Sequence, residues 1–270
     1  MWRAAVKVAI TGYKGLIGSE LIKQGCVPLE CDVTSKVEVD HEINAVVPDV
    51  IIHCAALTDV NECENNSKKA FNINVKGTTN ILDIFDGKFI FLSTVHVFNG
   101  KKYWPYSEKH KPEPTNVYGF SKWAGEVVTL YYGSENGIVI RTSKVFDYNY
   151  LKPTLETLKM GAALDFPTFI TRSFVHVEHF VHGLLALVNK PNMPNIINIA
   201  GTETLNYHQF WLVVASSFEI SADLIIPRKE RIDLAPRPFR GGLDVGLAKK
   251  LGIPLYSVYA GLELIKERMK

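Results

Sequence analysis

The amino-acid sequence predicts an α/β protein, in which a doubly wound parallel sheet is followed by a smaller second lobe. Two observations support this fold class. Short apolar runs alternate with helical patterns through residues 1–143, and this alternation is typical of parallel strands joined by right-handed helical crossovers. The runs are also continuously apolar, which is expected when helices cover both faces of the sheet.

Each element of the first half is predicted from a local signal. A helix over 15–25 stops at Gly25, and a helix over 37–47 ends before Pro48, because glycine and proline interrupt helices. Strands are expected over 6–11, 26–33, 49–56, 88–94 and 137–143, and further helices over 67–85 and around 115–126.

The turn between the first strand and the first helix carries the stretch "TGYKGLIG". It places Gly12, Gly15 and Gly18 at GxxGxxG spacing. The first glycine permits a tight turn, the second lets a pyrophosphate approach the backbone, and the third lets the helix pack closely on the sheet. The helix N-terminus adds N–H donors and partial positive charge. This context predicts a Rossmann-type dinucleotide site.

The residues that read the ribose of the dinucleotide leave two alternatives open. Glu30 and Asp32 follow the second strand, where a carboxylate would bind a 2′-hydroxyl and repel a 2′-phosphate. Lys14 in the glycine turn could instead pair with a 2′-phosphate. We therefore expect NADP or NAD as the cofactor, and favour NADP slightly.

The pattern loosens after residue 143. Helices are predicted over 151–164, 179–189, 207–218 and 258–269, with a strand over 195–201 and a proline- and arginine-rich stretch over 226–244. We expect a dinucleotide-binding Rossmann domain over 1–143, to which segments near 172–200 return. Residues 144–270 are expected to form mainly a substrate-binding lobe, and the ligands should bind at the switch point of the sheet.

A tyrosine and a lysine, Tyr118 and Lys122, lie one helical turn apart in "TNVYGFSKWAGE". Tyrosine has a pKa of about 10, and a nearby ammonium would stabilise its phenolate and let it act as an acid or base. Ser93 or Thr94, at the end of a predicted strand, could hold the substrate oxygen within reach of the phenol. The glycine turn, the strand-end hydroxyl and the Tyr/Lys helix together predict a catalytic site.

These stretches resemble the extended short-chain dehydrogenases/reductases, and most closely the dTDP-4-dehydrorhamnose reductases of the sugar-nucleotide branch. The matching stretches include "TGYKGLIG", "LSTVHVFNG", "PYSEKHKPEPTNVYGFSKWAGE" and "RPFRGGLD". The resemblance implies a catalytic triad of Thr94, Tyr118 and Lys122. It also implies cofactor contacts from Gly12, Tyr13, Lys14, Gly15, Leu16, Ile17, Asp32, Val33, Cys54, Ala55, Ala56, Asn74, Ser93, Tyr118 and Lys122.

The implied reaction is hydride transfer from NAD(P)H to the C4 carbonyl of a 4-keto-6-deoxy sugar nucleotide. The residues expected to bind substrate are Val95, His96, Lys144, Arg172 and Arg237, and Trp104 and Tyr106 could flank the sugar. Three of these depart from the family pattern. Val95 and His96 stand where the reductases read Asp-Tyr, and Lys144 stands where they usually carry Trp.

These departures leave two alternatives to a simple reductase. One is a bifunctional 3,5-epimerase/4-reductase, in which His96 or Lys144 takes part in epimerisation, since a histidine can serve as a base. The other is a non-catalytic regulatory subunit similar to methionine adenosyltransferase subunit beta, which binds a dinucleotide and modulates a partner. The intact Tyr118 and Lys122 favour the enzyme.

The bulk composition sets limits on partners and location. Net charge is +2 without a long single-sign run, which argues against nucleic acid and a polybasic membrane surface. No run is long enough to span a membrane, and the four cysteines show no metal-ligand spacing. His176, His179 and His182 lack a completing ligand, so no metal is expected. We expect a cytoplasmic protein with reduced thiols, and the resemblance implies a homodimer paired through the Asn74 and Tyr118 helices.

Overall fold

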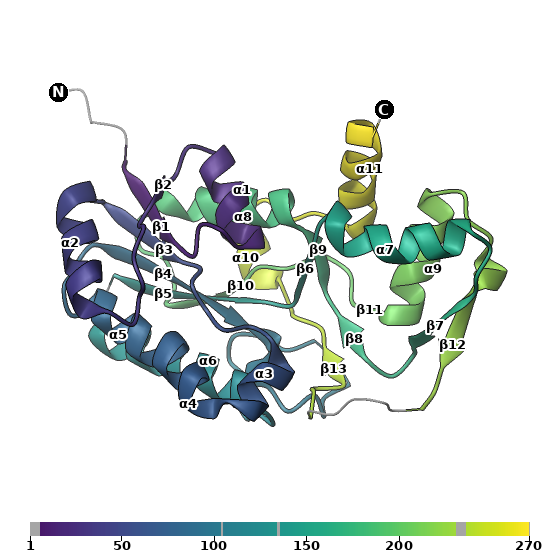
Figure 1. Cartoon of the computed structure of the whole chain (residues 1–270), viewed down its shortest axis with the longest axis horizontal. Coiled ribbons are helices and arrows are strands. Elements are labelled where there is room, and N and C mark those ends of the chain that lie inside the picture. Colours follow the sequence, from purple (N-terminus) through teal and green to yellow (C-terminus); the bar gives the residue numbers. More distant parts are fainter. Residues whose placement is uncertain (1–5, 104, 134–135, 231–235, 270) are drawn as a thin grey trace.

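A computed structural model describes residues 6–103, 105–133, 136–230 and 236–269. Its centre is a sheet of six parallel strands in the order β10-β5-β4-β3-β1-β2 (Figure 1). The strands are β1 (Val8–Thr11), β2 (Val27–Pro28), β3 (Val50–His53), β4 (Lys88–Thr94), β5 (Gly137–Thr142) and β10 (Ile196–Asn198). This arrangement confirms the predicted doubly wound α/β fold.

The chain reverses its direction of winding around β1. From β1 it passes through α1 (Leu16–Lys23) to β2 at one edge, and then through α2 (Lys36–Val46) to β3 on the opposite side of β1. The carboxyl ends of β1 and β3 therefore stand at a topological switch point, where crevices of open α/β sheets bind their ligands.

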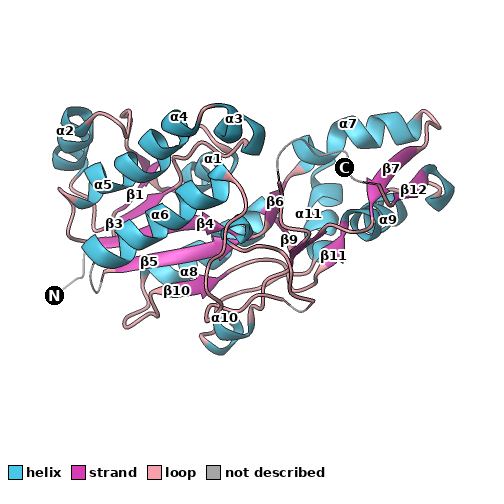
Figure 2. Ribbon diagram, turned by 90° about the horizontal axis from the view of Figure 1, so that it is seen from below, coloured by secondary structure: helices cyan, strands magenta, loops and turns pink. Residues whose placement is uncertain are grey.

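Successive strand residues pack into two different cores. Ile10, Ile52 and Ile90 face α1 and α8 (Val177–Val188), whereas their neighbours Ile51 and Phe89 face α2, α5 and α6. This alternation follows from the pleat of the strand. Both faces of the sheet are thereby buried, which explains why the strands are apolar throughout (Figure 2).

Two elements of the first half differ from their predicted extents. The helix expected over 67–85 is divided into α4 (Ser67–Phe71), a π-helical turn (Asn72–Lys76) and α5 (Gly77–Leu82). The strand expected over 26–33 is reduced to Val27–Pro28, at the edge of the sheet. Pro28 has no N–H to donate to a ladder, so it suits an edge. The other helices on this side are α3 (Val60–Asn65) and α6 (Val117–Tyr132).

The second lobe is assembled from short strands that lie far apart in sequence. β6 (Lys144–Phe146) pairs with β9 (Phe174–His176), β7 (Leu164–Pro167) pairs with β12 (Ile225–Arg228), and β8 (Thr171–Arg172) lies between β11 (Leu205–Asn206) and β13 (Arg240–Gly241). Helices α7 (Tyr148–Lys159), α9 (Tyr207–Ser217) and α11 (Val258–Met269) enclose its core. Of the segments near 172–200, β10 joins the central sheet and α8 packs on α1, whereas β9 pairs with β6.

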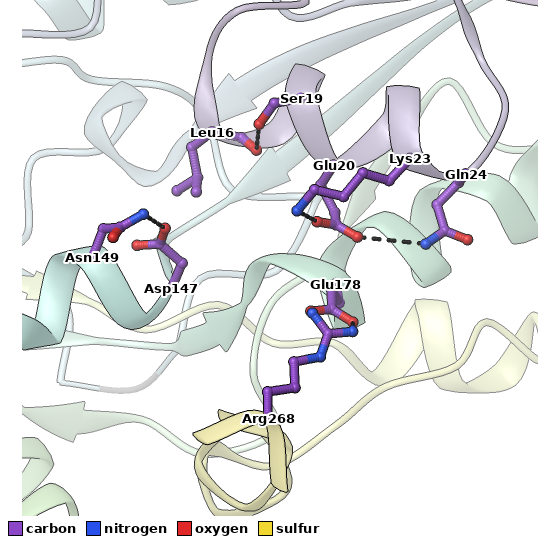
Figure 3. A network of polar contacts seen from close by, with 9 residues as sticks. All are labelled: Leu16, Ser19, Glu20, Lys23, Gln24, Asp147, Asn149, Glu178 and Arg268. Atoms are coloured by element: carbon purple, nitrogen blue, oxygen red, sulfur yellow. Dashed lines mark hydrogen bonds and ion pairs between the residues drawn. The ribbon is translucent and has the colours of Figure 1, made fainter. Parts of the chain in front are cut away.

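Ion pairs accompany the contact between the C-terminal helix and the sheet domain (Figure 3). Arg268 of α11 pairs with Glu178 of α8. Beside them, the buried Glu20 of α1 accepts from Lys23 at 2.8 Å. The short α10 (Gly246–Lys250) packs against β10 on the same side. No helix in the described ranges is long and apolar enough to cross a membrane.

Candidate active site

Two adjoining cavities open at the switch point, and both are lined by Gly12. The larger, of about 480 Å³, extends from the glycine turn to the second lobe. Its walls are Gly12, Gly15, Leu16, Ile17, Gly18, Cys54, Ala56, Thr58, Val60, Thr94, His96, Tyr118, Ser143, Lys144, Val145, Arg172, Tyr207 and Arg237. The smaller, of about 370 Å³, is lined by Gly12, Tyr13, Lys14, Leu29, Glu30, Cys31, Asp32, Val33, Ala55 and Ile73.

The glycine turn is shaped to bring backbone close to a ligand. Gly12 has a φ of +67°, and a Cβ there would lie 2.6 Å from the backbone nitrogen of Ala55. A Cβ on Gly18 would lie 2.3 Å from the Gly12 carbonyl oxygen, so this position needs glycine for helix packing. Gly15 is the N-cap of α1 and no side chain caps that helix. The first-turn N–H groups therefore face the larger cavity without a side-chain acceptor, which fits a pyrophosphate.

The smaller cavity holds groups of both charges. Lys14 and the carboxylates Glu30 and Asp32 all line it, and the Tyr13 hydroxyl donates to Glu30 Oε2 at 3.3 Å. A basic and an acidic group at the same cavity suit a 2′-phosphate and a 2′-hydroxyl respectively. The geometry thus agrees with an adenosine site, and both NADP and NAD remain candidates.

Tyr118 stands on the first turn of α6 and borders the larger cavity. Burial raises the pKa of its phenol to about 12, and a hydrogen bond from Thr94 opposes that rise. Thr94 ends β4 and lines the same cavity. At neutral pH the phenol is therefore protonated, which is the form a proton donor requires.

Lys122 lies one turn further along α6 and is buried. Burial lowers the pKa of its amine to about 7, against an opposing effect of Glu126, and Nζ lies 4.0 Å from the Phe91 ring centroid. The sequence-based interpretation held that the Lys122 ammonium lowers the pKa of Tyr118. In the structure burial is the main influence on the phenol pKa. Burial also lowers the pKa of Lys122, which is therefore only partly charged near pH 7 in the protein alone.

Ser93, the other hydroxyl considered at this strand end, points away from the cavity. Its Oγ donates to Glu126 Oε1 at 2.5 Å, and Glu126 also forms a buried ion pair with Arg141 at 2.7 Å. The neighbouring Val95 is fully buried in a hydrophobic cluster with Val97. Adjacent strand residues face opposite sides, so Thr94 reaches the cavity whereas Ser93 does not.

Asn74, predicted to contact the cofactor, supports the wall of the site from behind. Its Oδ1 accepts from the Leu57 nitrogen at 2.8 Å, and its Nδ2 donates to the Leu57 oxygen at 3.1 Å and to Ser121 Oγ at 2.8 Å. The side chain is fully buried within the π-helical turn. It therefore fixes the loop after β3 to α6 and lines neither cavity.

His96 follows Thr94 and faces Tyr118 edge-on, with ring centroids 5.4 Å apart. Its Nδ1 lies 3.2 Å from Asn116 Nδ2. Burial, together with the cations Arg172, Arg237 and Lys144, holds the pKa of the imidazole well below its usual range. The ring is therefore neutral at physiological pH.

Three cations from separate segments face the glycine turn across the cavity: Lys144 of β6, Arg172 of β8, and Arg237. Arg172 donates to the Pro238 oxygen at 3.0 Å, and Arg237 lies 3.5 Å from Asn61 Oδ1. Burial lowers the pKa of Lys144. The described lining of this cavity contains no carboxylate, so it is suited to an anionic ligand.

Several wall residues were not predicted from the sequence. Thr58 and Val60 follow β3, Ser143 precedes β6, and Tyr207 begins α9. Tyr207 comes to the site through contacts with Phe174 and the Ile170 carbonyl, which no local pattern reveals. Tyr106, in contrast, stacks on Phe98 within a buried cluster, and Trp104 lies outside the described residues.

The histidines near α8 make aromatic ring contacts, and His182 also makes a hydrogen bond. His179 stacks on Tyr256 with centroids 3.9 Å apart, and His182 Nδ1 lies 2.5 Å from the Tyr256 hydroxyl. Within the described ranges, no three His, Cys, Asp or Glu residues are placed to hold a metal. Cys26, Cys31, Cys54 and Cys63 are all unpaired.

The doubly wound sheet, the glycine turn and the Tyr/Lys helix on a shared cavity define an extended short-chain dehydrogenase/reductase. Within that class the chain belongs to the family described as the RmlD substrate binding domain, which matches residues 6–269.

Similar proteins include dTDP-4-dehydrorhamnose reductases and a subunit of methionine adenosyltransferase. The dTDP-4-dehydrorhamnose reductase of Mycolicibacterium smegmatis is 28% identical, over 87% of this chain and 75% of that protein. The methionine adenosyltransferase 2 subunit beta of Xenopus laevis is 27% identical, over 92% and 83%. The crystal structure of dTDP-4-dehydrorhamnose reductase from Bacillus anthracis in complex with NADP has a TM-score of 0.89 at 24% identity, over 98% and 99%. The last similarity shows the common fold.

Proposed function

We propose that this protein uses NAD(P)H to reduce the C4 carbonyl of a 4-keto-6-deoxy sugar nucleotide. The observation that carries the proposal is the shared cavity, in which the glycine turn lies at one end and Thr94 and Tyr118 form the wall beside it. The bound nicotinamide would supply the hydride, while the protein supplies position and charge stabilisation. Family membership and the 28%-identical reductase support the same reaction.

In the proposed reaction the chain's own residues handle the proton. The Thr94 hydroxyl holds the carbonyl oxygen near Tyr118, and the protonated phenol donates to that oxygen as negative charge develops on it. Lys122 then stabilises the phenolate. Its amine, with a pKa of about 7 in the protein alone, gains its proton more fully once an anion forms beside it.

The substrate side of the cavity supports an anionic, diphosphate-bearing ligand. Arg172 and Arg237 are proposed to bind the diphosphate, because guanidinium groups suit bidentate contacts with phosphate. Lys144 and His96 are closer in the chain to the catalytic strand ends and are proposed to contact the sugar. We assign residues 1–143 to the cofactor domain and 144–270 mainly to the substrate lobe, with β10 and α8 returning to the former.

We further propose a cytoplasmic homodimer that favours NADP slightly over NAD. Phe71 of α4 and Phe120, Val127 and Tyr131 of α6 are exposed apolar side chains on the two helix regions expected to pair. Exposed apolar patches of this kind are typical of protein interfaces. A monomeric mass at micromolar protein concentration would contradict the dimer.

The function is tested by following NADH and NADPH oxidation with 4-keto-6-deoxyhexoses linked to dTDP, UDP, GDP or CDP. We expect one nucleotide series to be reduced, with NMR of the product showing a new C4 hydroxyl. Absence of turnover across the whole panel, with both cofactors, would overturn the proposal.

An alternative function is that of a non-catalytic regulatory subunit, because one similar protein is a methionine adenosyltransferase subunit. It predicts cofactor binding without reduction of any keto sugar, together with capture of a methionine adenosyltransferase catalytic subunit in a pull-down. The bifunctional epimerase alternative predicts solvent deuterium at C3 or C5 of the keto sugar, since epimerisation exchanges those protons.

A further inference from the structure

His96 and Asn116 lie together behind the catalytic tyrosine, although 20 residues separate them in sequence. Asn116 is the N-cap of α6, and its Oδ1 accepts from the Gly119 nitrogen at 2.7 Å. Its Nδ2 donates to the Pro236 oxygen at 2.7 Å. These partners fix the orientation of the amide, because only its oxygen can accept and only its nitrogen can donate.

The fixed amide determines which imidazole nitrogen of His96 carries the proton. Asn116 Nδ2 lies 3.2 Å from His96 Nδ1, so Nδ1 must accept and cannot carry a hydrogen of its own. In a neutral imidazole the proton then resides on Nε2. The charged groups acting on the ring are the cations Arg172, Arg237 and Lys144, and these oppose a second proton.

Nε2 is left available for a ligand. Among the residues that the structure describes, none makes a hydrogen bond to Nε2, and this atom is not buried away from solvent. His96 lines the larger cavity, and its ring meets that of Tyr118 edge-on. An N–H donor is therefore presented beside the phenol.

We infer that Asn116 is a positioning residue that holds His96 as the Nε2–H tautomer, so that His96 donates a hydrogen bond to a sugar oxygen vicinal to the carbonyl being reduced. The substrate half of this inference rests on the proposed function. The tautomer also denies His96 the role of base, since Nε2 has no free lone pair to accept a proton from C3 or C5. Epimerisation with His96 as the base is thereby excluded.

The decisive variant is Asn116→Asp, with Asn116→Ser as its control. Both replacements can still cap α6, because Asp, Ser and Asn are comparable N-caps. An aspartate, however, offers Nδ1 an acceptor in place of a donor, and so should move the ring proton to Nδ1 or generate the imidazolium. Serine keeps the helix cap but is too short to replace the amide contacts to His96 and Pro236. Asn116→Ser therefore removes the donor without offering Nδ1 an acceptor.

The tautomer is read by long-range ¹H–¹⁵N correlation of the histidine ring, with the His96 signals assigned by their loss in His96→Asn. We expect a protonated Nε2 and a bare Nδ1 in the native protein, and protonation at Nδ1 in Asn116→Asp. The same tautomer in both proteins would overturn the inference. This readout needs no substrate, so it stands or falls separately from the proposed reductase activity.

The substrate contact is read with the keto sugar that the native protein reduces. We expect Asn116→Asp to raise KM about tenfold, the size of one lost hydrogen bond, while Asn116→Ser retains the native unfolding temperature within a few degrees. We also expect any solvent deuterium at C3 or C5 to be incorporated equally by the native protein and His96→Asn. An unchanged KM after the tautomer has moved, or deuterium incorporation that is lost in His96→Asn, would overturn the donor role of His96.

Discussion

The two sides of the active-site cavity are built in different ways. On the cofactor side, Gly12 directly follows β1, Gly15 caps α1, and Thr94 ends β4 of the same parallel sheet. On the substrate side, Lys144, Arg172 and Arg237 come from β6, β8 and the segment before β13. One side is therefore specified by local turns and the other by long-range packing.

The two sides of the cavity should respond differently to mutation. The cofactor side depends on backbone positions where no side chain fits, so substitutions there should affect folding and cofactor binding together. The substrate side depends on single side chains carried by the short strands and loops of the second lobe. Substitutions there should change substrate affinity and leave the fold intact. Three predictions test this contrast, and they are given from the largest effect to the smallest.

The largest effect is expected for Gly12→Ala. Gly12 and Gly25 both have positive φ, at 67° and 87°, but only Gly12 meets backbone atoms of Ala55 at about 2.6 Å where the Cβ would be. We expect Gly12→Ala to lower the free energy of unfolding by about 3 kcal/mol and to abolish NADPH binding. Gly25→Ala carries the conformational strain alone, about 1 kcal/mol, with unchanged binding. Equal losses in urea unfolding would contradict steric crowding as the cause.

A medium effect is expected from Lys122, which is buried on α6 one turn after Tyr118. The pKa of its amine is about 7 in the folded protein and ordinarily 10.5, so above pH 7 the unfolded chain binds more protons. The free energy of unfolding should therefore rise with pH, by about 1.4 kcal/mol per unit for this group.

The measurement compares the native protein with Lys122→Met between about pH 7 and 8.5. Both proteins carry the same cysteines, so thiol titration cancels in the difference. We expect the stability difference between them to shift in favour of the native protein by about 2 kcal/mol across this window. A pH-independent difference would show that the buried amine keeps its ordinary pKa.

The smallest effect is expected for Lys144→Met on the substrate side. Lys144 lines the cavity and its Nζ lies 4.0 Å from the Tyr150 ring centroid. We expect KM for the sugar nucleotide to rise about tenfold, because a charge-assisted contact is lost, with the Kd for NADPH and the unfolding temperature unchanged. Lys111→Met, in an exposed loop, serves as the control. A matching rise in the Kd for NADPH would place Lys144 on the cofactor side instead.

The same contrast explains which parts of the site could be predicted from the sequence. The glycine turn, the Thr94 strand end and the Tyr118 helix were predicted correctly as neighbours, because parallel strands end at one edge. The sequence could not decide between Ser93 and Thr94, because the choice depends on which side chain of the strand faces the cavity. In the structure, the hydrogen bond from Ser93 to Glu126 shows that Ser93 faces away from it. Ser143 and Tyr207 were missed because no local pattern identifies residues positioned by distant segments.

The protonation states of Tyr118 and Lys122 could not be predicted from the sequence. Spacing predicted that Lys122 lies near Tyr118, but not that burial would lower the pKa of Lys122 to about 7 and raise that of Tyr118 to about 12. Desolvation depends on everything packed around a group. The residue types and their spacing therefore indicated the chemistry, while the protonation states required the folded protein.

The most direct test of the proposed reduction is Tyr118→Phe, compared with Tyr131→Phe at the exposed end of the same helix. Turnover of the keto sugar nucleotide and the Kd for NADPH are measured for both variants. We predict that Tyr118→Phe lowers kcat about a thousandfold, the range of a lost general acid, with the Kd for NADPH within about twofold of native. Tyr131→Phe should behave as the native protein does. Near-native turnover in Tyr118→Phe would contradict Tyr118 as the proton donor.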